Sequence, residues 1–91
     1  MAVHSLDHYI ASSPDVAGGR PRIAGRRITV EDVAIWHERL GRSIEEICIE
    51  HNLGLAEVHA ALAYYFDHKA EIDKRIKDDE AWLSSLKAST P

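Results

Sequence analysis

Helix start and stop signals follow one another closely between residues 29 and 67, so this stretch can form only short helices joined by tight turns. Thr29 and Asp32 have the spacing of a capping box, in which each residue's side chain binds the other's backbone N–H. Ser43 and Glu46 repeat that spacing. The predicted helices cover residues 30–40, 43–50 and 54–67, and the first two are followed by the helix-ending residues Gly41 and Asn52.

Apolar residues recur at helical spacing in all three segments, so each helix has a stripe to bury against the other two. The residues expected to face inward are Val30, Val33, Ala34, Trp36, His37, Leu40, Ile44, Ile47, Cys48, Leu55, Val58, Leu62, Tyr65 and Phe66. Two short helices followed after a tight turn by a longer one form the order of a helix-turn-helix module. A fourth helix is predicted over residues 70–87, with an apolar seam that Asp79 interrupts.

A small β-hairpin is expected ahead of the helices. Ile23 and Ile28 are its apolar anchors, Gly25 lies at the bend between them, and Tyr9 begins a short strand upstream. The predicted fold is mainly α, in a single domain over residues 1–91. Its parts are a hairpin region (9–30), a three-helix helix-turn-helix core (30–67) and an additional C-terminal helix (70–87).

Composition narrows the class of protein. Hydrophobic residues make up 45% and charged residues 29% of the 91 residues, which suits a folded globule. No apolar stretch approaches the roughly 20 residues that span a bilayer, and no signal peptide is visible, so we expect a cytoplasmic protein without a membrane partner. A chain this short buries only about 60–65% of its unfolded surface, which favours a homodimer or larger assembly.

Positive charge is concentrated in one part of an acidic chain. Residues 20–42 carry a net charge of +3, whereas the whole chain carries −4. Such a basic patch can contact an anion locally. The residues predicted to bind double-stranded DNA are Arg20, Arg22, Arg26, Arg42 and His59. For Arg27 we favour an ion pair with Glu31 or Asp32 over a phosphate contact.

The predicted third helix, residues 54–67, lacks the cations that hold DNA phosphates, because it contains no Lys or Arg. Its small, alanine-rich side is better suited to close contact with protein. The fourth helix offers apolar anchors and the acidic residues Asp73, Asp78, Asp79 and Glu80, which suit a basic partner surface. The residues predicted at a partner or dimer interface are Ala56, Ala60, Ala63, Tyr64, Ile72, Ile76, Trp82 and Leu83.

Nothing in the sequence predicts catalysis. It has no phosphate loop, no nucleophile elbow and no committed pair of carboxylates. The six histidines lack ligand spacing except for His4 and His8, and the single cysteine, Cys48, has the spacing of a buried core residue. We therefore expect no enzyme activity, no metal site and no cofactor.

Three segments resemble the prokaryotic domain-of-unknown-function family 433. They are Gly18-Gly19-Arg20-Pro21-Arg22-Ile23-Ala24-Gly25-Arg26-Arg27-Ile28-Thr29-Val30, Ser43-Ile44-Glu45-Glu46-Ile47 and Val58-His59-Ala60-Ala61-Leu62-Ala63-Tyr64-Tyr65. The resemblance covers about residues 9–75. It implies a helix-turn-helix fold behind a small β-element, and an antitoxin-like partner of a PIN-like ribonuclease toxin encoded alongside.

Three functions follow as expectations. The first is an antitoxin that neutralises a PIN-like ribonuclease by protein–protein binding, with operator DNA binding and autoregulation added by the hairpin. The second is a DNA-binding transcriptional regulator without a toxin partner. The third is a homo-oligomeric interaction module that binds neither.

Overall fold

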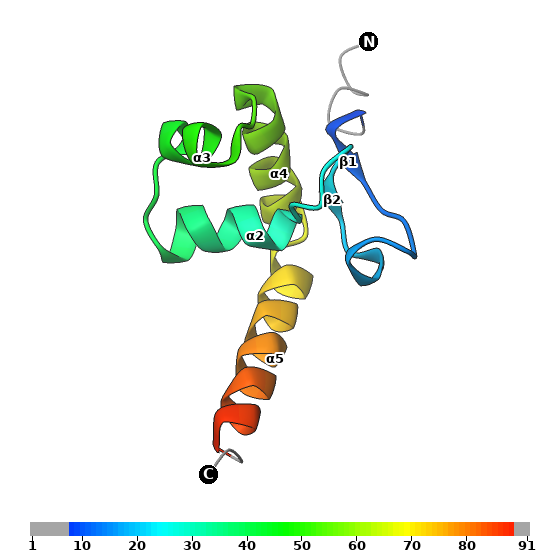
Figure 1. Ribbon diagram of the computed structural model, residues 1–91, viewed down its shortest axis with the longest axis vertical. Coiled ribbons are helices and arrows are strands. Elements are labelled where there is room, and N and C mark those ends of the chain that lie inside the picture. The colour runs from blue at the N-terminus through cyan, green and yellow to red at the C-terminus, as the bar shows by residue number, and fades with distance from the viewer. Residues whose placement is uncertain (1–7, 89–91) are drawn as a thin grey trace.

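The computed structural model describes residues 8–88. The chain forms, in order, β1 (Ile10–Ala11), η2 (Ala17–Gly19), β2 (Arg22–Ile23), α2 (Val30–Ala34), η3 (Ile35–Arg39), α3 (Ile44–His51), α4 (Leu55–Asp67) and α5 (Lys69–Ala88). The prediction of a mainly helical fold with a small antiparallel hairpin and an additional C-terminal helix is confirmed (Figure 1). Among residues 8–88, no helix combines the length and apolar character needed to cross a membrane.

Both predicted capping boxes are present. The Thr29 hydroxyl accepts from the Asp32 N–H at 3.1 Å, and the Asp32 carboxylate accepts from the Thr29 N–H at 3.0 Å. The Ser43 hydroxyl and the Glu46 carboxylate make the same exchange at 3.1 and 2.8 Å. Asn52 ends α3 with a left-handed φ of 53°. Local sequence signals therefore determine where α2 and α3 begin and where α3 ends.

The first helix departs from the expected regular α-helix. After Ala34 the chain continues as η3, a wider π-helical stretch. Within η3 the Trp36 ring stacks on His51 of α3, with ring centroids 3.8 Å apart and an angle of 5° between the planes. π-Helical turns are locally less favourable than α-helix and are rarely visible in sequence periodicity. In this chain the π-helical stretch is the part of the first helix that carries the Trp36 contact with α3.

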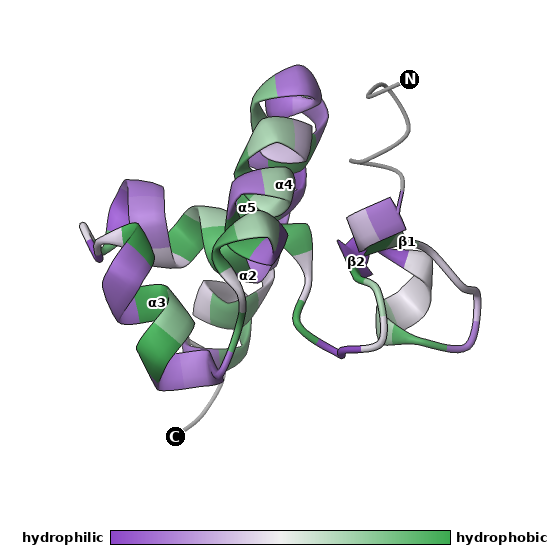
Figure 2. Ribbon diagram, turned by 90° about the horizontal axis from the view of Figure 1, so that it is seen from above, coloured by the Kyte–Doolittle hydropathy of each residue, from purple (hydrophilic) through white to green (hydrophobic). Residues whose placement is uncertain are grey.

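The β-element extends beyond the hairpin expected over residues 21–30, because its first strand also pairs with β1. β2 pairs with β1, in the register Ile10 opposite Ile23 and Ala11 opposite Arg22. On its other side Arg22 forms the expected antiparallel contact with Thr29, although only as an isolated bridge. Residues 23–28 form a tight turn closed by the Ile23 N–H and the Ile28 carbonyl at 2.9 Å. Both strands lie to one side of the helices (Figures 1 and 2). Ile23 is fully buried, so this strand is held by the helical core as well as by its partner strand.

The core lies between α2, α3, α4 and the first half of α5. It consists of Ile23, Val30, Val33, Ala34, Ile47, Leu53, Val58, Ala61, Leu62, Tyr65, Ile72 and Ile76. Three residues expected to face inward are instead more than half exposed: Leu40, Leu55 and Phe66. Ala60 and Ala61 occupy the inner side of α4 in their place. Small residues on this side allow α4 to lie close to α2. The spacing of large apolar residues alone does not reveal that alanines fill this contact.

α5 continues the long axis of the molecule from the end of α4 and runs away from the other helices (Figure 1). Its 20 residues span about 30 Å at 1.5 Å per residue. Ile72 and Ile76 are 3% and 2% exposed, whereas every residue from Glu80 to Lys87 is exposed. Only the first half of α5 therefore packs on the body of the protein.

Candidate interaction surfaces

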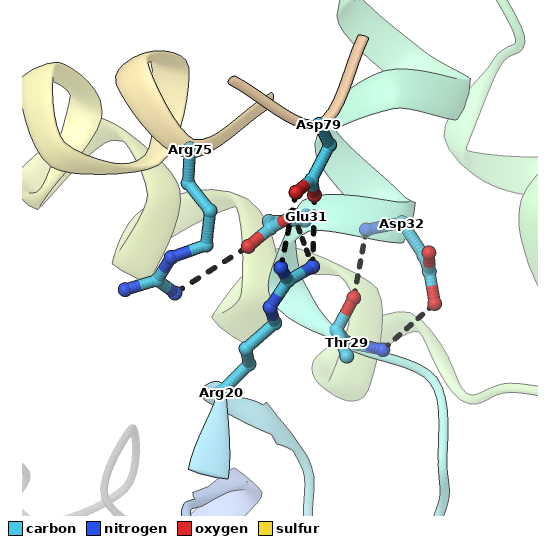
Figure 3. Close-up of polar contacts among 6 residues, drawn as sticks. All are labelled: Arg20, Thr29, Glu31, Asp32, Arg75 and Asp79. Atoms are coloured by element: carbon cyan, nitrogen blue, oxygen red, sulfur yellow. Dashed lines mark hydrogen bonds and ion pairs between the residues drawn. The ribbon is translucent and has the colours of Figure 1, made fainter. Parts of the chain in front are cut away.

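A cluster of four charged residues fastens α5 to the start of α2 (Figure 3). The Arg20 guanidinium donates to both carboxylate oxygens of Asp79 on α5, at 2.9 and 3.2 Å. It also donates to Glu31 of α2 at 3.2 Å, and Arg75 of α5 donates to the other Glu31 oxygen at 3.4 Å. Two arginines and two carboxylates thus neutralise one another where three segments meet.

Glu31 is the buried centre of this cluster, with 5% of the residue exposed. Burial raises the pKa of its carboxyl group, and the positive charges of Arg20 and Arg75 oppose that rise. The hydrogen bond to Asp79 raises the pKa of Arg20, although burial works against it. The cluster is therefore a structural joint, in which Arg20 holds α5 in place.

These contacts correct two predictions. Arg20 was expected to bind DNA, but its guanidinium is occupied by Glu31 and Asp79. Arg27 was expected to pair with Glu31 or Asp32, but it is exposed and forms no ion pair within residues 8–88. The sequence does contain a signal for the Arg20 contact. Asp79 interrupts the apolar seam of α5, and a carboxylate in such a position indicates that a cation packs against the helix.

The other predicted DNA-binding residues are dispersed. Arg42 pairs with Glu50 at 2.6 Å, so its charge is neutralised at the surface. Arg26 donates to the carbonyls of His51 and Asn52, at 3.3 and 2.6 Å, and Arg22 donates to the Ser13 hydroxyl at 3.1 Å. His59 is exposed on α4. The structure keeps Arg22 and Arg26 near one turn and places His59 and Arg42 elsewhere.

The outer side of α4 is uncharged over most of its length. Its exposed residues are Leu55, Ala56, His59, Ala63, Phe66 and Asp67. Ala60, predicted at an interface, is 1% exposed and belongs to this chain's own interior. Tyr64 is half-buried and stacks on His68, with ring centroids 4.0 Å apart. Ala56 and Ala63 are thus the predicted α4 interface residues that are well exposed.

The seam of α5 divides into a buried and an exposed part. Ile72 and Ile76 were predicted to contact a partner, but they are buried in this chain's core. Trp82 and Leu83 are 63% and 51% exposed. Leu83 continues the Ile72–Ile76 seam at helical spacing beyond the last core residue. On α5, the exposed end is therefore the part of the predicted interface that stays accessible.

The four acidic residues of α5 that were expected to meet a basic partner are all paired within the chain. The pairs are Asp73 with Lys69, Asp78 with Lys74, Asp79 with Arg20, and Glu80 with Arg39. Spacing of i,i+4 supplies two of these cations, and the fold supplies the other two. The negative charge of these four residues is therefore balanced within the chain.

Within residues 8–88, no three His, Cys, Asp or Glu side chains gather in a way that fits a metal ion. Cys48 is half-buried against the core. The charged cluster around Glu31 is saturated by its own ion pairs.

Comparison with known proteins identifies one family. The family described as "Protein of unknown function (DUF433)" matches residues 10–65. A crystal structure of a DUF433 member protein from Anabaena variabilis ATCC 29413 is similar to this chain, with 29% sequence identity and a TM-score of 0.72. The similarity covers 82% of this chain and 74% of that one. No curated protein matches the chain. With more than half of its length matched, the chain belongs to the DUF433 family.

Proposed function

We propose that the protein is an antitoxin that binds and neutralises a PIN-like ribonuclease through the exposed end of α5. The observation that carries this proposal is the exposure of two large apolar side chains, Trp82 and Leu83, at 63% and 51%, on the half of α5 beyond the last core residue. Exposed apolar surface of this kind marks protein-binding sites. Tryptophan is also among the residues that dominate binding energy at such sites.

Continuity with the core explains why this surface suits a protein partner. The same side of α5 that packs on the body through Ile72 and Ile76 carries Leu83 farther along. A partner placed there would prolong the existing core and would shield Trp82 from water. We infer that the complex forms in the cytoplasm. In it, α5 of this chain covers the substrate-binding surface of the nuclease.

The DNA-binding regulator has weaker support as an alternative. A helix that reads DNA needs polar side chains at base edges and cations nearby for phosphates. The exposed side of α4 offers His59 and no Lys or Arg. Arg20 and Arg42 are neutralised by carboxylates. The exposed side of α4 is therefore poorly suited to reading the major groove.

Co-expression with the protein encoded by the adjacent gene tests the antitoxin. We expect a nuclease to co-purify with this chain and to lose its ribonuclease activity in the complex. The double substitution Trp82→Ala with Leu83→Ala should abolish capture. Ile49→Ala is the matched control, because Ile49 is an exposed apolar residue on α3, at 82%. The proposal is wrong if the neighbour has no nuclease activity, or if the double variant captures it as well as the wild type does.

A second copy of this chain is the alternative occupant of the α5 surface. Light scattering gives the molar mass of the wild type and of the double variant, each measured without the nuclease. The two masses distinguish self-association from nuclease binding at this surface. A wild-type dimer that becomes monomeric in the double variant would assign the surface to self-association. A wild-type monomer that binds the nuclease would assign it to the partner.

A further inference from the structure

Three arginines surround one shallow hollow next to the turn after β2. The hollow has a volume of about 250 Å³ and is lined by Val16, Arg22, Gly25, Arg26 and Arg27. Gly25 takes a left-handed φ of 79° there, which lets the chain bend tightly. The bend carries Arg26 and Arg27 to the same hollow as Arg22, which lies on β2.

Ion pairing separates these three arginines from all the others in residues 8–88. Arg20 and Arg75 pair with Glu31, Arg39 pairs with Glu80, and Arg42 pairs with Glu50. Within the same residues, Arg22, Arg26 and Arg27 form no ion pair. The three arginines whose positive charge is not compensated by a paired carboxylate therefore all line one hollow.

Neutral acceptors hold two of these guanidinium groups in place. Arg22 donates to the Ser13 hydroxyl at 3.1 Å and to the Arg26 carbonyl at 3.4 Å. Arg26 donates to the carbonyls of His51 and Asn52 at the end of α3. A guanidinium has five N–H donors, so each retains donors for a further acceptor. Both side chains are thus positioned without losing charge.

One of the remaining donors is buried and unused. The Nε–H of Arg22 is the only buried side-chain nitrogen or oxygen in residues 8–88 that lacks a hydrogen-bond partner. Buried polar groups are nearly always paired, so an unpaired one calls for an explanation. An anion drawn into the hollow would supply negative charge at the guanidinium that bears this donor.

We propose that the hollow lined by Arg22, Arg26 and Arg27 binds a phosphate group. Guanidinium groups suit phosphate because their N–H donors form charge-assisted, often bidentate hydrogen bonds to its oxygens. The ligand is either a phosphodiester of a nucleic acid backbone or a free phosphate. The net charge of −4 opposes indiscriminate binding of polyanions, so recognition is local. The site is separate from the α5 surface and does not rest on the proposed antitoxin function.

Nuclear magnetic resonance titration of the full chain tests the site, with inorganic phosphate in one arm and a short DNA duplex in the other. We expect both ligands to shift the backbone amides of Gly25, Arg26 and Arg27. Binding of the duplex at lower concentration than phosphate would identify a nucleic acid backbone as the source. A response to phosphate without a response to the duplex would support the site with free phosphate as its ligand.

Arg27→Ala is the decisive variant, because Arg27 is exposed and its side chain makes no hydrogen bond or ion pair among the described residues. We expect weaker binding of both ligands, and for the duplex a salt-dependence slope smaller by about one. Lys77→Ala is the control for charge, since Lys77 is an exposed cation on α5 without an ion pair in residues 8–88. It should bind as the wild type does.

Two results would overturn the proposal. One is the absence of shifts at residues 25–27 with either ligand. The other is an equal loss of binding in Arg27→Ala and Lys77→Ala, which would show that only overall charge matters. Nuclease capture by Arg27→Ala distinguishes this failure from failure of the antitoxin, because capture depends on Trp82 and Leu83.

Discussion

Arg20 and Asp79 are separated by 59 residues in the chain, yet the guanidinium of the first donates to both carboxylate oxygens of the second. This bidentate pair connects the segment before β2 to the middle of α5. Because Arg20 also contacts the buried carboxylate of Glu31, the pair positions α5 relative to α2. The surface proposed to bind a partner begins a few residues beyond it.

Substitution Arg20→Ala should lower the free energy of unfolding by about 2 kcal/mol, because it leaves the buried Glu31 with one cation instead of two. Arg42→Ala, which breaks an exposed pair with Glu50, should cost about 0–1 kcal/mol. Urea denaturation of both variants measures the difference. The double variant Arg20→Ala with Glu31→Gln should regain part of the loss. Equal costs for Arg20→Ala and Arg42→Ala would contradict a structural role for the cluster.

Glu31 should make stability depend on pH. Its pKa is raised above the ordinary value of 4.5 because it is buried, so the folded state binds this proton more readily than the unfolded state. Its contribution to the free energy of unfolding should therefore fall as pH rises from about 4.5 through the raised pKa. Denaturation of the wild type and Glu31→Gln between about pH 4 and pH 7 isolates the effect. A contribution that grows with pH would show that the two arginines outweigh burial.

Tyr65 and Asp73 connect α4 to α5 through a hydrogen bond of 2.6 Å. Tyr65→Phe should cost about 1–2 kcal/mol at neutral pH, since the acceptor is ionised. Tyr64→Phe is the control, because the neighbouring hydroxyl makes no hydrogen bond in residues 8–88. Thermal denaturation of both variants provides the comparison.

The cost of Tyr65→Phe should shrink in acid. Hydrogen bonds from Lys69 and Tyr65 hold the pKa of Asp73 below its ordinary 3.8. The stability that this carboxylate contributes is present above pH 3.8 and is lost as pH falls through the lowered pKa. The melting temperatures of wild type and variant should converge there. A gap that stays constant would assign the loss to packing.

The two halves of α5 should respond differently to truncation. Ile76→Ala removes a buried side chain and should cost about 2–5 kcal/mol. Leu83→Ala removes an exposed one and should change stability by less than about 0.5 kcal/mol. Chemical denaturation of each variant measures the cost. A large loss for Leu83→Ala would mean that the end of α5 packs on the protein in solution.

The sequence by itself determined where α2 and α3 begin and where α3 ends. Thr29, Ser43 and Asn52 act on backbone groups within a few residues of themselves, so their effects follow from local order along the chain. The periodic apolar residues likewise predicted most of the core, including Val33, Ile47, Val58 and Ile72.

Tertiary structure decided how the charges are used and which apolar residues remain exposed. The pairing of Arg20 with Asp79, and of β1 with β2, joins segments whose meeting depends on how the helices pack. The same packing neutralises Arg20 and leaves Arg27 exposed, the reverse of what we expected. Periodicity places residues on the same side of a helix. How far that side is buried depends on how much of the helix lies against the rest of the chain. For α5 it stops after Ile76, which leaves Trp82 and Leu83 exposed.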